Sequence, residues 1–190
     1  MVSAVNKCLL IRFWDMKSYD FYKSLYDREL KRRIDLDNSL STPIGLIAIL
    51  IGLISYVIAN IDLEVCNILI LIIFSFTIIS MILIICSIFF IARSYNNFFK
   101  GYGYRNFALT TKLREFEMKV NEYNDNNIVK QKIDFEATII DRLTQLTDDH
   151  IIFNDFRQRN LYYAKSLIIG TAFSTMMAVI LEVVYKYLLI

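Results

Sequence analysis

The sequence predicts an all-α integral membrane protein with three transmembrane helices and a charged helical region outside the bilayer. Three stretches, 43–61, 68–92 and 166–190, contain only two charged residues, Glu182 and Lys186. Each stretch supplies the roughly 20 apolar residues that a helix needs to cross the hydrocarbon core. The rest of the chain is rich in Lys, Arg, Asp and Glu. A single soluble domain does not separate charged and apolar residues in this way.

These stretches divide the chain into four parts. We expect a cytosolic amphipathic helix in 1–42, a transmembrane hairpin in 43–92, a cytosolic helical region in 93–165 and a third transmembrane helix in 166–190. Residues 1–42 hold eight Lys and Arg, residues 93–165 hold twelve, and the turn 62–67 between the first two spans holds none. Basic segments stay on the cytoplasmic side. The N-terminus is therefore expected inside and the C-terminus outside, in the inner (cytoplasmic) membrane.

The N-terminal part carries aromatic and basic side chains at helical spacing over 13–40. Tyr19, Tyr22 and Tyr26 recur along this segment with Lys and Arg between them. Such a helix suits the headgroup layer of a membrane. Docking on the lipid bilayer and packing on the protein body both remain open. A nucleic-acid partner is not expected, because acidic residues dilute the basic face.

The first span carries small residues at heptad spacing. They are Gly45, Ala48, Gly52, Ser55 and Ala59. Small residues let a second helix approach closely, and close packing drives helix association in lipid. We expect the second span to be the partner, with a neighbouring subunit as the alternative. The run Ser41-Thr42-Pro43 predicts a hydroxyl N-cap at the start of this helix.

The second and third spans each present small polar residues on one face. The second has Thr77, Ser80 and Ser87, continued by Ser94. The third has Gly170, Thr171, Ser174, Ala178 and Glu182. These faces predict either close helix packing or the lining of a pore. An ionisable residue at such depth costs on the order of 2.5–3.5 kcal/mol and normally faces a bundle interior or water. In a symmetric oligomer Glu182 would form a ring of carboxylates; an ion pair with Lys186 is the structural alternative.

The cytosolic region predicts a helical hairpin over 104–147. Its first helix, 104–123, has an apolar heptad seam, and a second helix is expected over about 128–147. The seam consists of Leu109, Leu113, Phe116, Val120 and Tyr123. It could equally form a coiled-coil contact between subunits. Gly101 and Gly103 predict a hinge between the membrane and cytosolic helices.

A further helix is expected to follow 128–147 and to continue into the third span. Asp148 or Asp149 is the expected N-cap of this helix. His150, the only histidine, is expected on the surface near this helix start.

Catalytic and metal-binding motifs are missing from the sequence. It contains no phosphate-binding loop, no paired metal ligands and no nucleophile with an adjacent base. Cys8, Cys66 and Cys86 lack metal-site spacing. We therefore expect that the protein is not an enzyme and needs no cofactor or metal.

The order of the elements resembles a known family. A basic aromatic helix with the run YDRELKRR (26–33), a tight two-span hairpin and charged helices from Tyr104 are similar to SLATT-type two-transmembrane effectors of bacterial antiviral defence systems. The resemblance covers about residues 13–123. It implies a membrane pore that depolarises or kills an infected cell and is gated by a nucleotide signal or a partner protein. The third span departs from the two-span layout, and no nucleotide-binding motif can be carried over.

These features lead to two functional hypotheses. The first is a homo-oligomeric channel or pore-forming effector, a tetramer or larger, that responds to a cytosolic signal and perturbs the membrane, as in abortive infection. The second is a non-conducting membrane scaffold or accessory subunit that recruits a cytosolic partner protein through helices 104–147.

Overall fold

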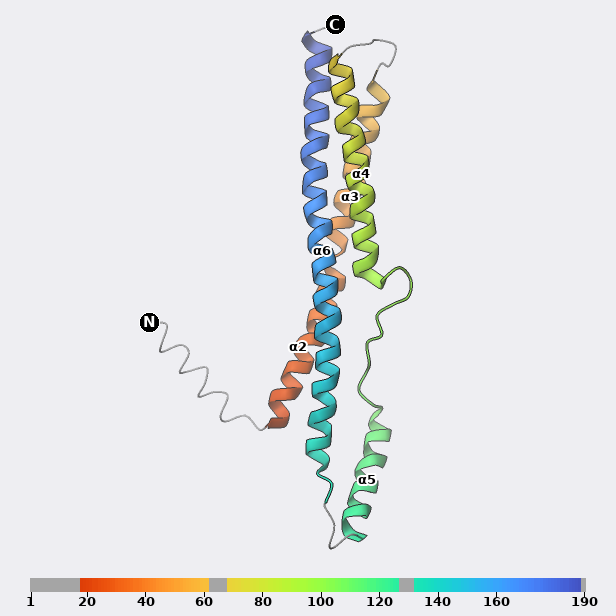
Figure 1. The fold of residues 1–190 in the computed structure, drawn as a ribbon, viewed down its shortest axis with the longest axis vertical. Helices are drawn as coiled ribbons and strands as arrows, with labels where there is room; N and C mark the ends of the chain where they lie inside the picture. Colours follow the sequence, from red (N-terminus) through yellow and green to blue (C-terminus); the bar gives the residue numbers. More distant parts are fainter. Residues whose placement is uncertain (1–17, 62–67, 127–131, 189–190) are drawn as a thin grey trace, which may run out of the picture. The chain divides into compact units, whose positions relative to one another are not determined.

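The computed structural model describes residues 18–61, 68–126 and 132–188. Within these residues the chain forms five α-helices and no β-strand (Figure 1). They are α2 (Ser18–Asn38), α3 (Ser41–Asn60), α4 (Ile68–Asn96), α5 (Thr110–Asn126) and α6 (Phe135–Leu188). Three helical stretches are long and apolar enough to cross a membrane: Ser18–Asn60, whose apolar part is α3, then α4, and the later part of α6. The expected all-helical architecture with three helices long and apolar enough to cross a membrane is confirmed.

The start of α3 differs from the expected hydroxyl cap. Leu40 occupies the N-cap position with helical backbone angles, and no side chain caps this end. Ser41 Oγ instead donates a hydrogen bond to the backbone oxygen of Asn38 at 3.0 Å. Because the backbone stays nearly helical between α2 and α3, carbonyl oxygens of the preceding turn lie within reach of the hydroxyl. Pro43 lies in the first turn of α3, where its missing N–H would have no helical acceptor.

Helix α6 is one unbroken helix of 54 residues, and the expected break before Asp148 is wrong. Asp148 and Asp149 lie in its interior and cap nothing. The helix starts at Phe135, directly after Asp134, whose Oδ1 accepts a hydrogen bond from the backbone N–H of Ala137 at 3.2 Å. A pair of aspartates favours a helix start but does not enforce one. No Gly or Pro occurs between Phe135 and Gly170, so helix propagation continues through the pair.

The described residues divide into two compact units. The body unit holds the residues up to Ile34 together with Gly103–Asn154, and the apolar unit holds Asp35–Tyr102 with the residues from Asp155 on. Helices α3 and α4 belong to the apolar unit and α5 to the body unit, while α2 and α6 each contribute to both.

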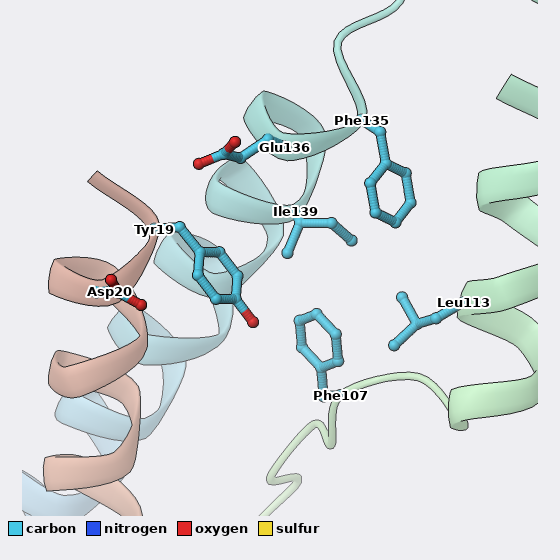
Figure 2. Close-up of a pocket in the computed structure, with 7 residues that line it drawn as sticks. All are labelled: Tyr19, Asp20, Phe107, Leu113, Phe135, Glu136 and Ile139. Atoms are coloured by element: carbon cyan, nitrogen blue, oxygen red, sulfur yellow. The ribbon is translucent and has the colours of Figure 1, made fainter. Parts of the chain in front are cut away.

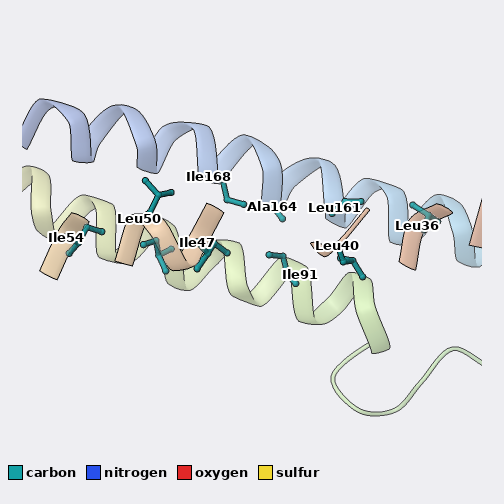
Figure 3. Packing of buried hydrophobic residues seen from close by; sticks show 10 residues of the cluster. Leu36, Leu40, Ile47, Leu50, Ile54, Ile91, Leu161, Ala164 and Ile168 are labelled. Carbon is teal, nitrogen blue, oxygen red and sulfur yellow. The ribbon is translucent and has the colours of Figure 1, made fainter. Parts of the chain in front are cut away.

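The apolar unit is built on the contact of α3, α4 and α6. Their bulky aliphatic side chains converge in one cluster (Figure 3). It contains Leu36, Leu40, Ile47, Leu50, Ile54, Ile84, Ile91, Leu161, Ala164 and Ile168. A second, smaller cluster joins Val57, Ile73 and Ala178. Apolar side chains on the outer faces, such as Ile49, Leu71 and Ile85, are exposed. Continuous exposed apolar surface of this kind suits contact with lipid rather than water.

The body unit has its own core. Tyr26 of α2 packs with Ile139, Leu143 and Leu146 of α6. Further side chains from all parts of the unit surround them: Tyr19, Tyr22, Leu30, Phe107, Leu113 and Phe135. The aromatic residues of α2 that suggested a membrane-facing helix therefore lie partly against protein.

Candidate functional site

Small polar side chains of α4 and α6 meet in the interior of the apolar unit. We call this set the hydroxyl seam. It consists of Thr77, Ser80, Ser87 and Ser94 on α4 and Thr171, Ser174 and Thr175 on α6, all of them buried. The seam shares its helices with the apolar clusters, so a polar line runs through an otherwise aliphatic bundle.

The seam is held by hydrogen bonds between the two helices. Ser87 Oγ donates to the backbone oxygen of Ala164 at 3.2 Å, and Ser94 Oγ donates to that of Arg157 at 2.9 Å. Ser174 Oγ donates to the backbone oxygen of Phe76 at 2.9 Å. Thr175 Oγ1 donates to Ser80 Oγ at 3.2 Å. Each such bond contributes on the order of 1 kcal/mol, and small side chains allow the close approach that the bonds require.

The remaining hydroxyls bond within their own helices. Thr77 Oγ1 and Ser80 Oγ donate to the carbonyls four residues earlier at 2.8 and 2.9 Å, and Thr171 Oγ1 does the same at 2.9 Å. The proposed pore-lining residues Thr77, Ser80, Ser87, Thr171 and Ser174 thus lie together in one chain, facing a neighbouring helix. Their hydroxyls are satisfied by protein in this arrangement.

Glu182 lies near the C-terminal end of α6 and is buried. Its Oε1 forms an ion pair with Lys186 Nζ at 3.2 Å, one helical turn further on. Both carboxylate oxygens lack solvent contact and accept no hydrogen bond of ordinary geometry from the described residues. Lys186 Nζ also donates to Asn60 Oδ1 at 2.8 Å, which links α6 to the end of α3. The ion pair that the spacing suggested is present, but it leaves most of the carboxylate's bonding capacity unused.

The small-residue stripe of α3 faces away from the other helices in the described part of the chain. Gly45, Ala48, Gly52, Ser55 and Ala59 are all exposed. A Cβ atom added at Gly45 or Gly52 would meet no atom of residues 18–61, 68–126 or 132–188 within 4 Å. The expected packing of this stripe on the second span is therefore wrong. The reason is that α3 has a second heptad stripe on its opposite side, and this bulky stripe makes the contact instead; it consists of Pro43, Ile47, Leu50, Ile54 and Val57.

Two other predicted packing residues do lie in a helix contact. Ala178 is fully buried in the cluster with Val57 and Ile73. A Cβ atom at Gly170 would lie 3.6 Å from Leu83 Cδ1, an ordinary contact distance. Gly170 therefore lies beside α4, although its position does not demand glycine.

The apolar seam predicted over 104–123 is split in the structure. Leu109 precedes α5 and is 71% exposed, and Phe116 and Tyr123 are exposed as well. Val120 is buried, and Leu113 packs against the core of the body unit. The end of α5 is tied to the chain before α6, because Asn124 exchanges two hydrogen bonds with the backbone of Ile133, each 2.9 Å.

The predicted hinge residues lie in an irregular segment after α4. Gly101 has a positive φ of 69°, and Asn97, Phe98 and Phe99 before it also have positive φ. Three consecutive non-glycine residues with positive φ carry backbone strain. The division between the two units falls between Tyr102 and Gly103. The strained turn thus lies beside the boundary of two compact units.

A buried polar cluster in the body unit was missed by the sequence analysis. His150 is fully buried rather than at the surface, with its ring against Tyr26 and Tyr104 and its Nε2 3.1 Å from the backbone oxygen of Arg105. Asn154, one turn later, donates to the backbone oxygen and a carboxylate oxygen of Glu29 at 3.0 and 3.1 Å. The Tyr104 hydroxyl donates to Asn154 Oδ1 at 2.8 Å.

Arg157 was missed in the same way. Its side chain is 2% exposed, and its Nε donates to the backbone oxygen of Ser94 at 2.9 Å. Its guanidinium also pairs with the carboxylate of Asp37 and lies over the ring of Tyr102. Ser94 is in the last turn of α4, where carbonyls lack helical donors, so Arg157 caps this helix end from another helix.

One signal in the sequence could have identified His150, Asn154 and Arg157 as buried residues. The buried positions of α6 recur in steps of three and four residues from Ile139 to Glu182, and His150, Asn154 and Arg157 fall on that stripe. A polar residue in register with an apolar stripe is a candidate for burial.

The described residues include no group of three His, Cys, Asp or Glu arranged to hold a metal ion. No protein-family model, curated protein or solved structure matches this chain.

Proposed function

We propose that this membrane protein assembles as a homo-oligomeric channel-type effector that responds to a signal from the cytosol. The hydroxyl seam carries the proposal. It runs through the apolar helices from Ser94 to Ser174, and α6 continues from it to the buried Glu182. A column of hydroxyls ending at a carboxylate has the chemistry of a cation path. In the closed arrangement the hydroxyls bond to protein; in the open state water and ions would take those bonds.

The outward stripe of α3 supports assembly. Gly45, Gly52 and their neighbours on the stripe leave a flat surface with none of the described residues against it. Since lipid tails offer no hydrophobic drive, a flat surface that permits close backbone contact is the usual basis of helix association in a bilayer. We assign this face to a second copy of the chain.

The charge distribution supports an orientation of the chain in the membrane. We place the body unit and the N-terminus in the cytoplasm and the C-terminus outside the inner membrane, because the basic residues concentrate in 1–42 and 93–165. The strained turn from Asn97 to Gly101 would absorb the movement when a nucleotide or a protein partner binds the body unit. In the antiviral role that we propose, opening would depolarise an infected cell, and deleting the protein would raise phage plating in its native host.

Ion flux from proteoliposomes tests the proposal directly. We expect the wild-type protein to release trapped K⁺ when activated, and we expect Glu182→Gln to reduce the flux because the carboxylate is lost at constant size. Tyr187→Phe on the exposed face of α6 is the matched control. Equal flux in wild type and Glu182→Gln would remove Glu182 from the path, and no flux from any oligomer would refute a channel.

Oligomeric state provides the second test. Native mass spectrometry from detergent should give a tetramer or larger ring for the wild type, and Gly52→Leu should dissociate it by blocking close approach. Ile49→Leu, an exposed position off the stripe, should leave the assembly intact. A monomeric wild-type protein would refute the proposed assembly.

A second candidate function is supported by exposed apolar residues around α5. Leu109, Met118 and Tyr123 are 71%, 53% and 42% exposed. In this alternative the chain is a non-conducting scaffold whose residues 104–147 recruit a cytosolic protein. Loss of partner capture in Met118→Lys, with flux absent in every variant, would favour the scaffold over the channel.

A further inference from the structure

The body unit contains an open groove of about 530 Å³ that no part of the proposed channel uses. It lies between the start of α2, the segment before α5, α5 itself and the start of α6 (Figure 2). Seven residues line it: Tyr19, Asp20, Phe107, Leu113, Phe135, Glu136 and Ile139. Figure 2 shows the rings of Tyr19, Phe107 and Phe135 directed toward the same space.

The lining combines an apolar floor with two carboxylates. Phe107, Leu113, Phe135 and Ile139 supply aromatic and aliphatic surface. Asp20 and Glu136 are exposed and form no ion pair with the described residues. A groove of this composition fits an occupant with bulky apolar side chains and positive charge, since aromatic and carboxylate groups both attract cations.

The chain itself supplies a segment of that chemistry beside the groove. Residues 1–17 contain Leu9, Leu10, Ile11, Phe13 and Trp14. They also contain three basic residues, Lys7, Arg12 and Lys17, against one acidic residue, Asp15. This segment joins the described chain at Ser18, directly before Tyr19, which lines the groove.

We propose that residues 1–17 dock in this groove, with the apolar side chains around Trp14 on its floor and Arg12 or Lys17 at Asp20 and Glu136. Only Asp15, Met16 and Lys17 separate Trp14 from Ser18, the first residue of α2, so the tether between Trp14 and the groove is short. The seven residues from Cys8 to Trp14 then reach up to about 23 Å when extended, at roughly 3.3 Å per residue. A short tether holds the segment at an effective concentration in the millimolar range, so even a weak intrinsic affinity keeps the groove filled.

Docking gives the N-terminal segment a protein partner in place of the membrane surface. Its aromatic and basic residues suit a headgroup layer equally well by composition. The groove favours the protein partner over the membrane surface. Its carboxylates and apolar floor begin at Tyr19 and Asp20, directly after this segment in the sequence. The proposal does not depend on conduction.

Tryptophan fluorescence of the full-length protein in nanodiscs tests the docking, because Trp14 is the only tryptophan in the chain. In the wild type we expect blue-shifted emission, weak quenching by acrylamide and no quenching by lipids brominated on the acyl chain. Leu113→Glu places a charge on the groove floor and should red-shift the emission and raise the acrylamide quenching constant severalfold. Leu109→Glu is the matched control, since Leu109 is exposed and does not line the groove.

A second variant keeps the test decisive if Leu113→Glu disturbs the fold, which circular dichroism will reveal. The double change Asp20→Asn and Glu136→Gln leaves the apolar floor intact and should increase acrylamide quenching, with a weaker dependence on salt than in the wild type. Quenching of wild-type Trp14 by brominated lipid would place the segment in the membrane and overturn the proposal. Free access of acrylamide to wild-type Trp14 would overturn it as well.

Discussion

Replacing Arg157 with methionine removes the buried cation that caps α4 and joins it to α6. The guanidinium bonds the backbone oxygen of Ser94 at 2.9 Å and the carboxylate of Asp37, and its side chain is 2% exposed. Removing one partner of a fully buried ion pair costs about 3–5 kcal/mol. The carboxylate of Asp37 is 47% exposed and stays hydrated in the variant, so its contribution to this cost is smaller.

Most of the expected cost is the free energy of the lost hydrogen bonds to a charged group. Each contributes about 1.5–3 kcal/mol before the reduction for the partly exposed Asp37. We expect a total destabilisation of about 2–4 kcal/mol. For a chain of this size, each kcal/mol lowers the melting temperature by about 2–4 °C, so the shift should be about 5–15 °C.

Thermal unfolding in detergent, followed by far-ultraviolet circular dichroism, measures the shift. Arg159→Met is the matched control, because Arg159 is two residues away on the same helix and exposed. Arg157→Lys should fall between the two, since it keeps the charge but loses the planar fork. A melting temperature for Arg157→Met equal to that of Arg159→Met would refute the assignment of Arg157 as the cap of α4.

Three further predictions use the same unfolding assay. Ser87→Leu overpacks the contact of α4 with α6 and should cost about 1–3 kcal/mol, whereas Cys86→Leu on the exposed neighbouring position should be nearly neutral; equal effects would show that the seam is loosely packed. Asn154→Ala removes the two buried hydrogen bonds that Asn154 donates to Glu29 and the acceptor of the Tyr104 hydroxyl, and should cost about 1–3 kcal/mol; a neutral result would contradict the buried cluster. Asp134→Ala removes the cap of α6 and should cost about 0.5–2 kcal/mol, with Asp134→Asn close to wild type; an equal loss in both would exclude capping as the cause.

The sequence alone predicts the spans well because charge and length decide them. Stretches without charges, such as 68–92, can be stable in lipid only as helices whose backbone groups are all satisfied internally. The Glu182–Lys186 pair is equally local, since residues four apart on a helix are neighbours whatever surrounds them.

Which face of α3 packs could not be predicted from periodicity. Helix α3 carries a small stripe that includes Gly52 and a bulky stripe that includes Leu50, both at heptad spacing. Either pattern can form a helix contact, and the choice depends on the shapes of α4 and α6. The bulky stripe buries more aliphatic surface in the shared cluster, and the small stripe is left outward.

The buried polar residues show the same limit. His150 and Asn154 look like ordinary surface residues of a charged segment, and Arg157 lies among other charged residues. Their partners, the backbone of Arg105, Glu29 and Ser94, are distant in sequence. Burial of a polar group is stable only when such partners are in place.

The sequence by itself determined that this chain is helical, where it is apolar enough to enter a membrane, and which small polar residues share a helix face. These properties depend on local spacing and on the cost of placing charge in lipid. Only the tertiary structure decided that the hydroxyls of α4 face α6, that the glycines of α3 point outward and that Arg157 caps another helix. Those outcomes depend on which helices meet, and that is set by shape and by hydrogen-bond partners far apart in the chain.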